Sequence, residues 1–229
     1  MAILKASSSW KSTYPQAAVG ILAMENVANP AAHEELDWQK EALETALRAQ
    51  YGASDRQELR SLPSIAPYVT YYKQFKKTYH VLQQLESVAL KGKAIPRTAT
   101  LVEVMFMAEL KNQLLTAGHD LDRVQAPVSI IVARGNETYE GINGRELGTK
   151  AGDMMITDAV GILSSIVYGP DQRTSMSPTT SRVLFTTYAP AGISQQMLEN
   201  HLEDLKTYTK FICPRLIVLE ERIIRAVDG

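Results

Sequence analysis

Hydrophobic positions in the first half of the chain recur with the spacing of amphipathic helices. This spacing predicts helices over residues 33–51, 67–77, 79–91 and 100–115. In the first of them Leu36, Leu43 and Leu47 share one face, and Gly52 follows as a helix end. An apolar run over residues 17–24 precedes the helices and has the length of a buried strand.

The pattern changes to short apolar segments after Asp122. Glycines separate runs rich in Ile, Val, Thr and Tyr, which predict strands over residues 128–133, 154–157, 162–168 and 183–188. Ser194 is a predicted N-cap for a further helix, and residues 215–227 are predicted as a last helix. Because helices and strands are segregated, we expect an α+β fold, with helices 67–115 packed on a mostly antiparallel sheet from residues 128–188. A single domain over residues 1–229 is predicted, with its core at about 17–213.

Composition narrows the class of protein. Hydrophobic residues make up 45% of the chain and the net charge is −1, values of a globular rather than a disordered protein. Cys213 is the only cysteine, which excludes an internal disulfide and a multi-cysteine metal site. The chain has no apolar run of the ~20 residues that a membrane span needs, and residues 1–15 lack the apolar core of a signal peptide. We therefore expect a cytoplasmic protein without a membrane partner.

The common cofactor motifs are absent from the sequence. It has no GxxxxGK[ST] phosphate loop, no GxGxxG dinucleotide fingerprint and no GxSxG nucleophile turn. The prediction is accordingly no cofactor and no metal.

A basic stretch lies between Val69 and Thr98. It has six Lys or Arg residues against one acid, Glu86, and tyrosines are interleaved with the cations. Such a pattern suits a phosphate backbone and exposed bases, which makes RNA a candidate partner. The candidate RNA-binding residues are Lys73, Lys77, Lys93 and Arg97. Amphipathic helices with lysines extending from an apolar face give the same pattern, so that alternative remains open.

Two polar sets distant in sequence are candidates to converge on one pocket. Gly118-His119-Asp120 is predicted at a helix-to-strand corner, and a loop between strands carries Asp171, Arg173, Thr174 and Thr180. His119 is the candidate for proton transfer, since an imidazole titrates near neutral pH. Thr174 and Thr180 could stabilise an oxyanion, and Arg173 could bind a carboxylate or phosphate in a forked geometry. Ordinary turn chemistry and an Arg173–Asp171 surface ion pair explain the same residues without a site.

The order of these segments resembles the B3/B4 module of the phenylalanyl-tRNA synthetase beta subunit. The matching motifs are Asp120-Leu-Asp122-Arg123-Val124, the strand Ile130 to Arg134, the turn Asn143-Gly144-Arg145-Glu146, and Ile156-Thr157-Asp158. Free-standing proteins made of this module resemble the chain further, through Tyr72 to Phe75, Leu90 to Arg97, Arg173-Thr174, and Thr180 to Val183. The resemblance covers roughly residues 17–213.

The resemblance implies an α+β fold and tRNA binding. In the synthetase this module hosts the editing pocket, which hydrolyses tyrosine mischarged on the phenylalanine tRNA. The synthetase pattern has a histidine where this chain has Ala117, and a glutamate where it has Thr186. These departures separate the chain from synthetase-type editing and leave another ester hydrolysis open.

The sequence therefore predicts a free-standing tRNA-binding domain that hydrolyses or sequesters a charged tRNA in trans, with no aminoacylation domain. The candidate catalytic residues are His119, Thr174 and Thr180, and the candidate substrate contacts are Asp120, Asp171, Arg173 and Thr186. Two alternatives remain: a non-catalytic protein that binds an amino acid or a metabolite, and a protein-interaction domain.

Overall fold

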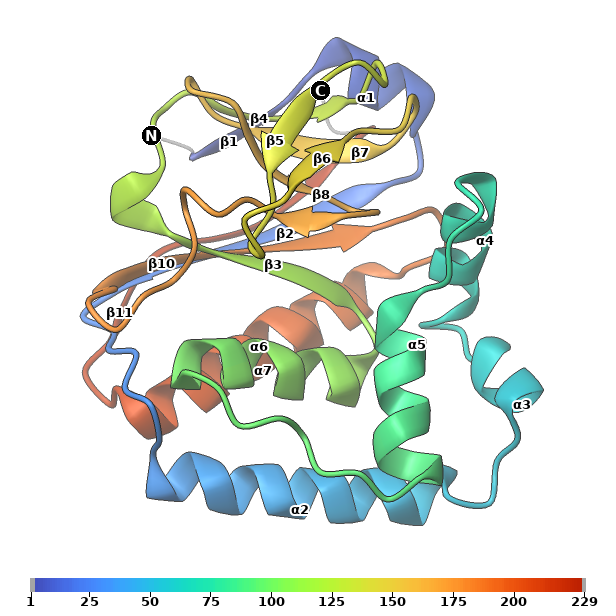
Figure 1. The fold of residues 1–229 in the computed structure, drawn as a ribbon, viewed down its shortest axis with the longest axis vertical. Coiled ribbons are helices and arrows are strands. Elements are labelled where there is room, and N and C mark those ends of the chain that lie inside the picture. The colour runs from blue at the N-terminus through green and yellow to red at the C-terminus, as the bar shows by residue number, and fades with distance from the viewer. Residues whose placement is uncertain (1–2, 228–229) are drawn as a thin grey trace.

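The longest strands of the chain form a central sheet. A computed structural model describes residues 3–227, and in it the sheet has the order β11-β2-β10-β3 with every neighbouring pair antiparallel (Figure 1). Its strands are β2 (Ala18–Glu25), β3 (Leu115–Asp120), β10 (Arg182–Ala189) and β11 (Ile217–Arg225). β2 and β10 are almost entirely buried, because the sheet is covered on both faces.

Helices cover one face of the central sheet. α6 (Thr100–Asn112) and α7 (Gln195–Ile212) lie directly against it, and α2 (Glu34–Tyr51) packs beneath them (Figure 1). Leu198 and Leu202 of α7 reach Gly20 of β2, where an added Cβ would lie 3.2 Å from a Leu202 methyl group. Glycine at this position lets the helix approach the sheet closely.

A second sheet, built of shorter strands, covers the other face. Its order is β1-β4-β7-β8-β9, and β1 pairs with β4 in parallel while the other pairs are antiparallel. The strands are β1 (Leu4–Ala6), β4 (Val128–Val132), β7 (Met154–Thr157), β8 (Ile162–Ser165) and β9 (Gly169–Pro170). Beside them lie α1 (Ser8–Thr13), with buried Trp10, and the hairpin β5 (Thr138–Glu140) to β6 (Glu146–Gly148).

A column of short helices runs along one side of these layers (Figure 1). It comprises α3 (Arg56–Arg60), α4 (Ala66–Gln74), α5 (His80–Leu85) and the π-helical turn η1 (Glu86–Leu90). Tyrosine hydroxyls tie α4 to both sheets. Tyr68 donates to the carbonyl of Tyr188 in β10, and Tyr72 donates to the carbonyl of Ile166 over 2.6 Å.

The structure confirms the α+β class and most predicted elements. The predicted sheet is divided, because β4, β7 and β8 belong to the second sheet whereas β10 joins the central one. The helix predicted over residues 100–115 ends earlier, since Gln113 adopts the left-handed conformation with φ 56°. The helix predicted over residues 215–227 is wrong. Its apolar positions also fit an extended strand, and pairing with β2 makes it β11.

A buried ion pair joins α2 to the start of α6. The Lys40 ammonium lies 2.6 Å from Oε2 of Glu103 and 3.1 Å from Oδ1 of Asp37, and both Lys40 and Glu103 are nearly inaccessible. The other Glu103 oxygen accepts from the Thr98 amide over 2.7 Å. The pair thereby also fixes the segment that leads into α6.

We expect Lys40→Met to lower the free energy of unfolding by about 3–5 kcal/mol, because it leaves the Glu103 carboxylate buried without its cation. Urea denaturation monitored by circular dichroism measures the loss. The double variant Lys40→Met with Glu103→Leu should recover part of it. The control is Lys111→Met, which removes the more exposed pair with Asp204 and should cost ~0–1 kcal/mol. Equal losses for Lys40→Met and Lys111→Met would contradict this prediction.

Candidate functional site

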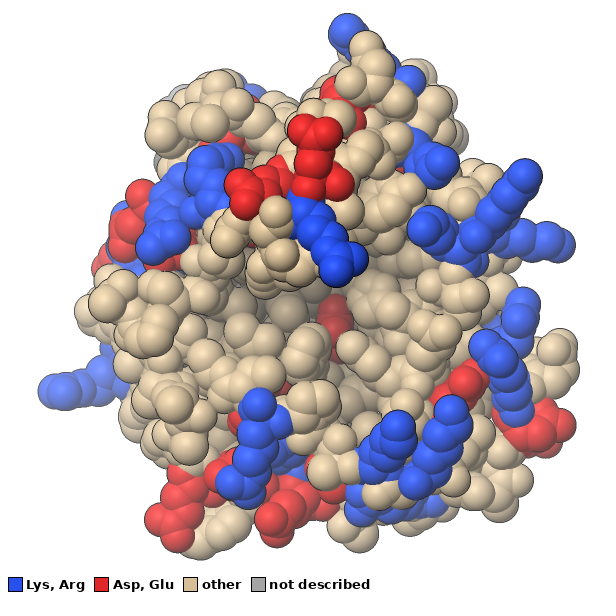
Figure 2. All heavy atoms as spheres, viewed as in Figure 1, with Lys and Arg blue, Asp and Glu red and all other residues tan. Residues whose placement is uncertain are grey.

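The predicted RNA-binding side chains lie on the helical side of the molecule. Lys73 is on α4, Lys77 follows that helix, and Lys93 and Arg97 lie in the segment before α6; all four are exposed. Figure 2 shows Lys and Arg side chains along the edge that carries α3, α4 and α5. Within residues 3–227, the one carboxylate near the Arg97 guanidinium is that of Asp37, at 3.8 Å. These cations are therefore available to an anion in solvent.

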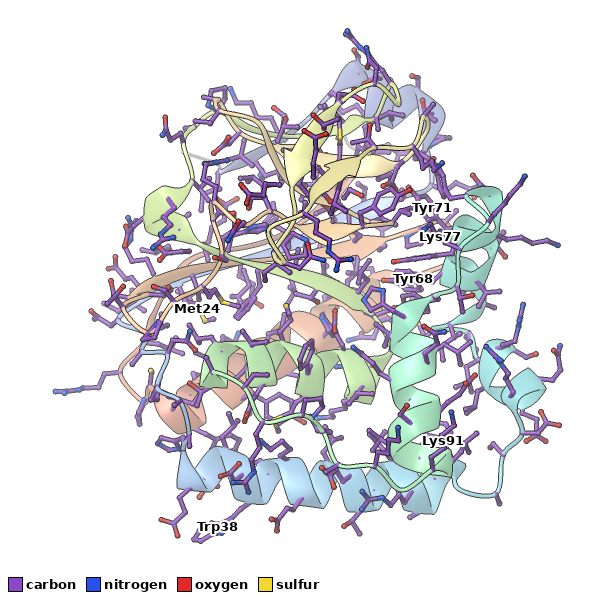
Figure 3. All side chains as sticks on the ribbon, viewed as in Figure 1. Met24, Trp38, Tyr68, Tyr71, Lys77 and Lys91 are labelled. Carbon is purple, nitrogen blue, oxygen red and sulfur yellow. The ribbon has the colours of Figure 1, made fainter. Side chains whose placement is uncertain are left out.

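The tyrosines interleaved with these lysines serve the core instead. Tyr68, Tyr71, Tyr72 and Tyr79 are buried, and the rings of Tyr68 and Tyr79 stack with centroids 4.4 Å apart. Figure 3 shows Tyr68 and Tyr71 directed into the molecule. The expectation that this cluster offers aromatic faces to bases is wrong for these four rings, because the helix column needs them to pack against the two sheets.

The two predicted polar sets meet between β3 and the loop after β9. Nδ1 of His119 lies 2.8 Å from the Thr174 hydroxyl, which in turn donates to the Asp171 carboxylate. The Asp120 amide donates to the Thr174 carbonyl over 2.8 Å, and the Thr180 hydroxyl donates to the Asp120 carboxylate over 2.8 Å. We call these five residues the β3 cluster. The two predicted sets therefore lie together as a hydrogen-bonded cluster; that they form a functional pocket stays a prediction.

The cluster is closed to solvent. His119 and Thr174 are 0% exposed, and Asp120, Asp171 and Thr180 are at most 5% exposed. Burial lowers the pKa of His119 to about 4, and the nearby Arg173 charge acts in the same direction. The imidazole is therefore neutral at pH 7. Its Nε2 is buried without a hydrogen-bond partner among the described residues.

Arg173 closes the outer side of the cluster. Its guanidinium donates to Asp158 over 3.0 Å and to the Arg123 carbonyl over 3.0 Å, and lies 3.5 Å from the Asp171 carboxylate. Arg173 thus links the loop after β9 to the 3-10 turn η2 (Leu121–Arg123) and to Asp158, just after β7. In the sequence, Asp158 stands out only as the last residue of the Ile156-Thr157-Asp158 motif. No local signal placed it beside Arg173, because the contact depends on the tertiary fold.

Ala117 and Thr186 are direct cross-strand partners in β3 and β10. They are the positions at which the resemblance expects a histidine and a glutamate, and here both are buried. The Thr186 hydroxyl has no hydrogen-bond partner among the described residues. Ala117 is two residues from His119 and therefore shares its face of β3. Two unpaired polar atoms, one on His119 and one on Thr186, thus occur at neighbouring positions of the same sheet.

The local setting of His119 differs from the prediction. Gly118, His119 and Asp120 lie inside β3 and not at a helix-to-strand corner. The partner strand β10 follows more than sixty residues later, so local periodicity could not reveal the pairing.

Within residues 3–227, no group of three or more His, Cys, Asp or Glu side chains is arranged to hold a metal ion. None of the helices in that range is sufficiently long and apolar to span a membrane.

Comparison with known proteins places the chain among synthetase-related domains. Residues 67–211 match the sequence model of the family described as B3/4 domain. A segment of 67 residues is 30% identical to the phenylalanine–tRNA ligase beta subunit of Mycoplasma genitalium, and covers 29% of this chain and 8% of that protein. A solved N-terminal fragment of the phenylalanyl-tRNA synthetase beta subunit from Pyrococcus horikoshii aligns with a TM-score of 0.48 at 10% identity, over 96% of this chain and 49% of the fragment. The matches therefore span a small part of one relative and about half of the other.

Acidification should destabilise the protein through His119. Because its pKa is lowered in the folded state, the stabilising effect of the neutral ring is present above pH 6.5 and is lost as the pH falls towards 4. We expect about 2 kcal/mol of this loss between pH 7 and pH 5. Urea unfolding of the wild type and of His119→Asn at both pH values measures the difference. Parallel losses in the two proteins would show that His119 does not titrate in this way.

Proposed function

This chain belongs to the B3/4 domain family, and we propose that it is a tRNA-binding domain that hydrolyses or sequesters a charged tRNA in trans. The observation that carries the proposal is the family match over residues 67–211, a range that includes the exposed cations and the whole β3 cluster. We propose the cytoplasm as its location, because charged tRNA is used there.

Electrostatics supports an RNA partner at the helical side. The net charge of the chain is −1, yet Lys73, Lys77, Lys93 and Arg97 are exposed on neighbouring segments where acids are scarce. Glu86, the one acid between Val69 and Thr98, is buried and paired with Arg56 at 2.9 Å. Glu86 therefore does not neutralise these four cations, and they can contact phosphates. Each phosphate that is neutralised releases a counterion, which favours binding.

The β3 cluster supplies groups for ester hydrolysis. In this proposal water adds to the ester carbonyl carbon, the bond to the terminal ribose oxygen breaks, and that oxygen leaves as a hydroxyl. His119 moves the proton, Thr174 and Thr180 donate to the oxyanion, and Asp120, Asp171, Arg173 and Thr186 contact the substrate. Because the cluster is closed and the Thr174 and Thr180 hydroxyls donate to Asp171 and Asp120, this role requires the loop at residues 171–181 to rearrange when substrate binds, so that both hydroxyls are freed while they stay near His119. Sequestration requires no such movement.

A second candidate function is the binding of a small molecule without turnover. A hollow of about 320 Å³ between α5, η1 and α6 favours it, since ligand sites of about 300–1,000 Å³ are usual. This function needs neither the β3 cluster nor an opening of the loop at residues 171–181.

Binding of tRNA should weaken steeply with salt and depend on the exposed cations. We expect each of Lys73→Ala, Lys77→Ala, Lys93→Ala and Arg97→Ala to reduce the slope of log affinity against log salt by about 1. Fluorescence anisotropy with labelled tRNA at several salt concentrations gives the slopes. Lys150→Ala and Lys210→Ala remove exposed cations on other elements and serve as controls. Unchanged tRNA affinity after charge reversal at all four positions would refute the RNA-binding face.

Hydrolysis is tested with a panel of charged and mischarged tRNAs. We expect faster release of the amino acid from at least one of them, and a loss of about a hundredfold or more in His119→Asn, since general acid–base groups contribute this much. Thr174→Val should also lose activity, whereas Thr179→Val should keep it, because the Thr179 hydroxyl is exposed and outside the cluster. Retained tRNA binding without release across the panel would leave sequestration and exclude hydrolysis.

A further inference from the structure

Strand β11 leaves one edge of the central sheet open. It has nine residues and pairs with β2 alone, and no other described segment pairs with its outer side. The opposite edge strand, β3, is shorter, and the amide of its last residue is bonded to Thr174. The edge of β1 in the second sheet is occupied in part, because Arg222 donates to the Leu4 carbonyl over 2.7 Å and Glu220 accepts from the Ile3 amide over 2.7 Å. An open strand edge is a template for pairing with another chain, so β11 is a candidate interface.

The register of β11 on β2 determines which of its backbone groups face outwards. Just after β11, the Ala226 amide donates to the Ala17 carbonyl over 3.1 Å, which continues the register of residues 220–225. In an antiparallel pair the backbone N–H and C=O groups of alternate residues point to opposite sides. Those of Glu221, Ile223 and Arg225 are therefore directed away from β2. A second antiparallel strand on this edge would form its hydrogen bonds with these three residues.

Two opposite charges on this edge are incompletely neutralised. The Lys206 ammonium on α7 lies 2.8 Å from the Glu221 carboxylate and 2.6 Å from that of Glu203, so one cation is shared by two acids. Arg225 donates to the neutral Gln195 side chain over 2.9 Å, and no carboxylate of residues 3–227 lies within ion-pair distance of it. Glu221 and Arg225 are four residues apart and lie on the same face of β11. One face of the open edge thus carries a negative and a positive charge on either side of Ile223.

We propose that β11 pairs antiparallel with β11 of a second copy of this chain, about a two-fold axis through Ile223. Glu221 of each copy then lies opposite Arg225 of the other, which neutralises both charges, and Ile223 lies opposite itself. A register centred on Glu221 or on Arg222 would place like charges opposite each other. The register centred on Ile223 also avoids the irregularity between Val218 and Glu220. The inference rests on this edge alone and does not require the proposed function.

Sedimentation equilibrium of the full chain tests the dimer. One chain has a mass of 25.3 kDa, and twice that mass is expected at submillimolar concentration. Ile223→Pro removes an amide that faces away from β2 and should give a monomer with the circular dichroism spectrum of the wild type, because an edge strand accepts proline where its amide faces solvent. A monomeric wild type, or a dimer that persists in folded Ile223→Pro, would overturn the proposal.

Exchange of the two charges tests the register. Glu221→Arg and Arg225→Glu each place like charges opposite each other on both sides of the axis, so each should weaken dimerisation about tenfold. The double variant restores opposite pairs and should recover the dimer. Glu41→Arg, the same charge change at an exposed position of α2, is the matched control and should dimerise like the wild type. A double variant as weak as the single variants, or single variants that dimerise like Glu41→Arg, would overturn the proposal. Because association is measured without RNA, its outcome is independent of tRNA binding.

Discussion

Burial of strand β10 on both faces is the constraint on which the rest of the structure depends. Helices α6 and α7 cover one face of this strand and the second sheet covers the other, so its polar side chains need partners inside the protein. The Thr187 hydroxyl lies 3.2 Å from the Thr116 hydroxyl, and the Thr116 hydroxyl lies 2.6 Å from Nε2 of His201 on α7. On the opposite face the Tyr188 hydroxyl lies 2.7 Å from the Ser164 hydroxyl of β8. Thr186, on the same face as Tyr188, has no such partner among the described residues.

The same constraint shapes the β3 cluster. β3 is an edge strand. The backbone amide of its last residue, Asp120, donates a hydrogen bond to the Thr174 carbonyl in the loop after β9. This contact brings Thr174 to His119 and leaves the imidazole neutral in the interior. The hydrogen bonds of the β3 cluster therefore also hold the loop after β9 against β3. Moving this loop away from β3 would break the hydrogen bond between the Asp120 amide and the Thr174 carbonyl.

Local patterns were sufficient for elements whose burial follows from their own sequence. The helix at residues 34–51 was predicted because Leu36, Leu43 and Leu47 share one face, and all three are buried. The secondary structure of residues 217–225 could not be assigned in this way, since it depends on pairing with β2, almost two hundred residues earlier. For the site, residue types predicted that His119 and Thr174 converge, but their complete burial follows from how the loop packs on β3. The hollow on the helical side combines α5, η1, α6 and the segment at residues 93–96, so no single motif indicates it.

The pairing of β2 has a consequence for the order in which the chain can be assembled. Glu25 of β2 pairs with Arg182, and Ala18 pairs with Ala189, so the partner of this strand is synthesised only after most of the protein. Until then an eight-residue apolar strand has both edges open, because β11, its other neighbour, is made later still. Contacts so distant in sequence slow folding and expose strand edges to aggregation. The layer that is most deeply buried in the finished protein is thus the one that remains incomplete for longest on the ribosome.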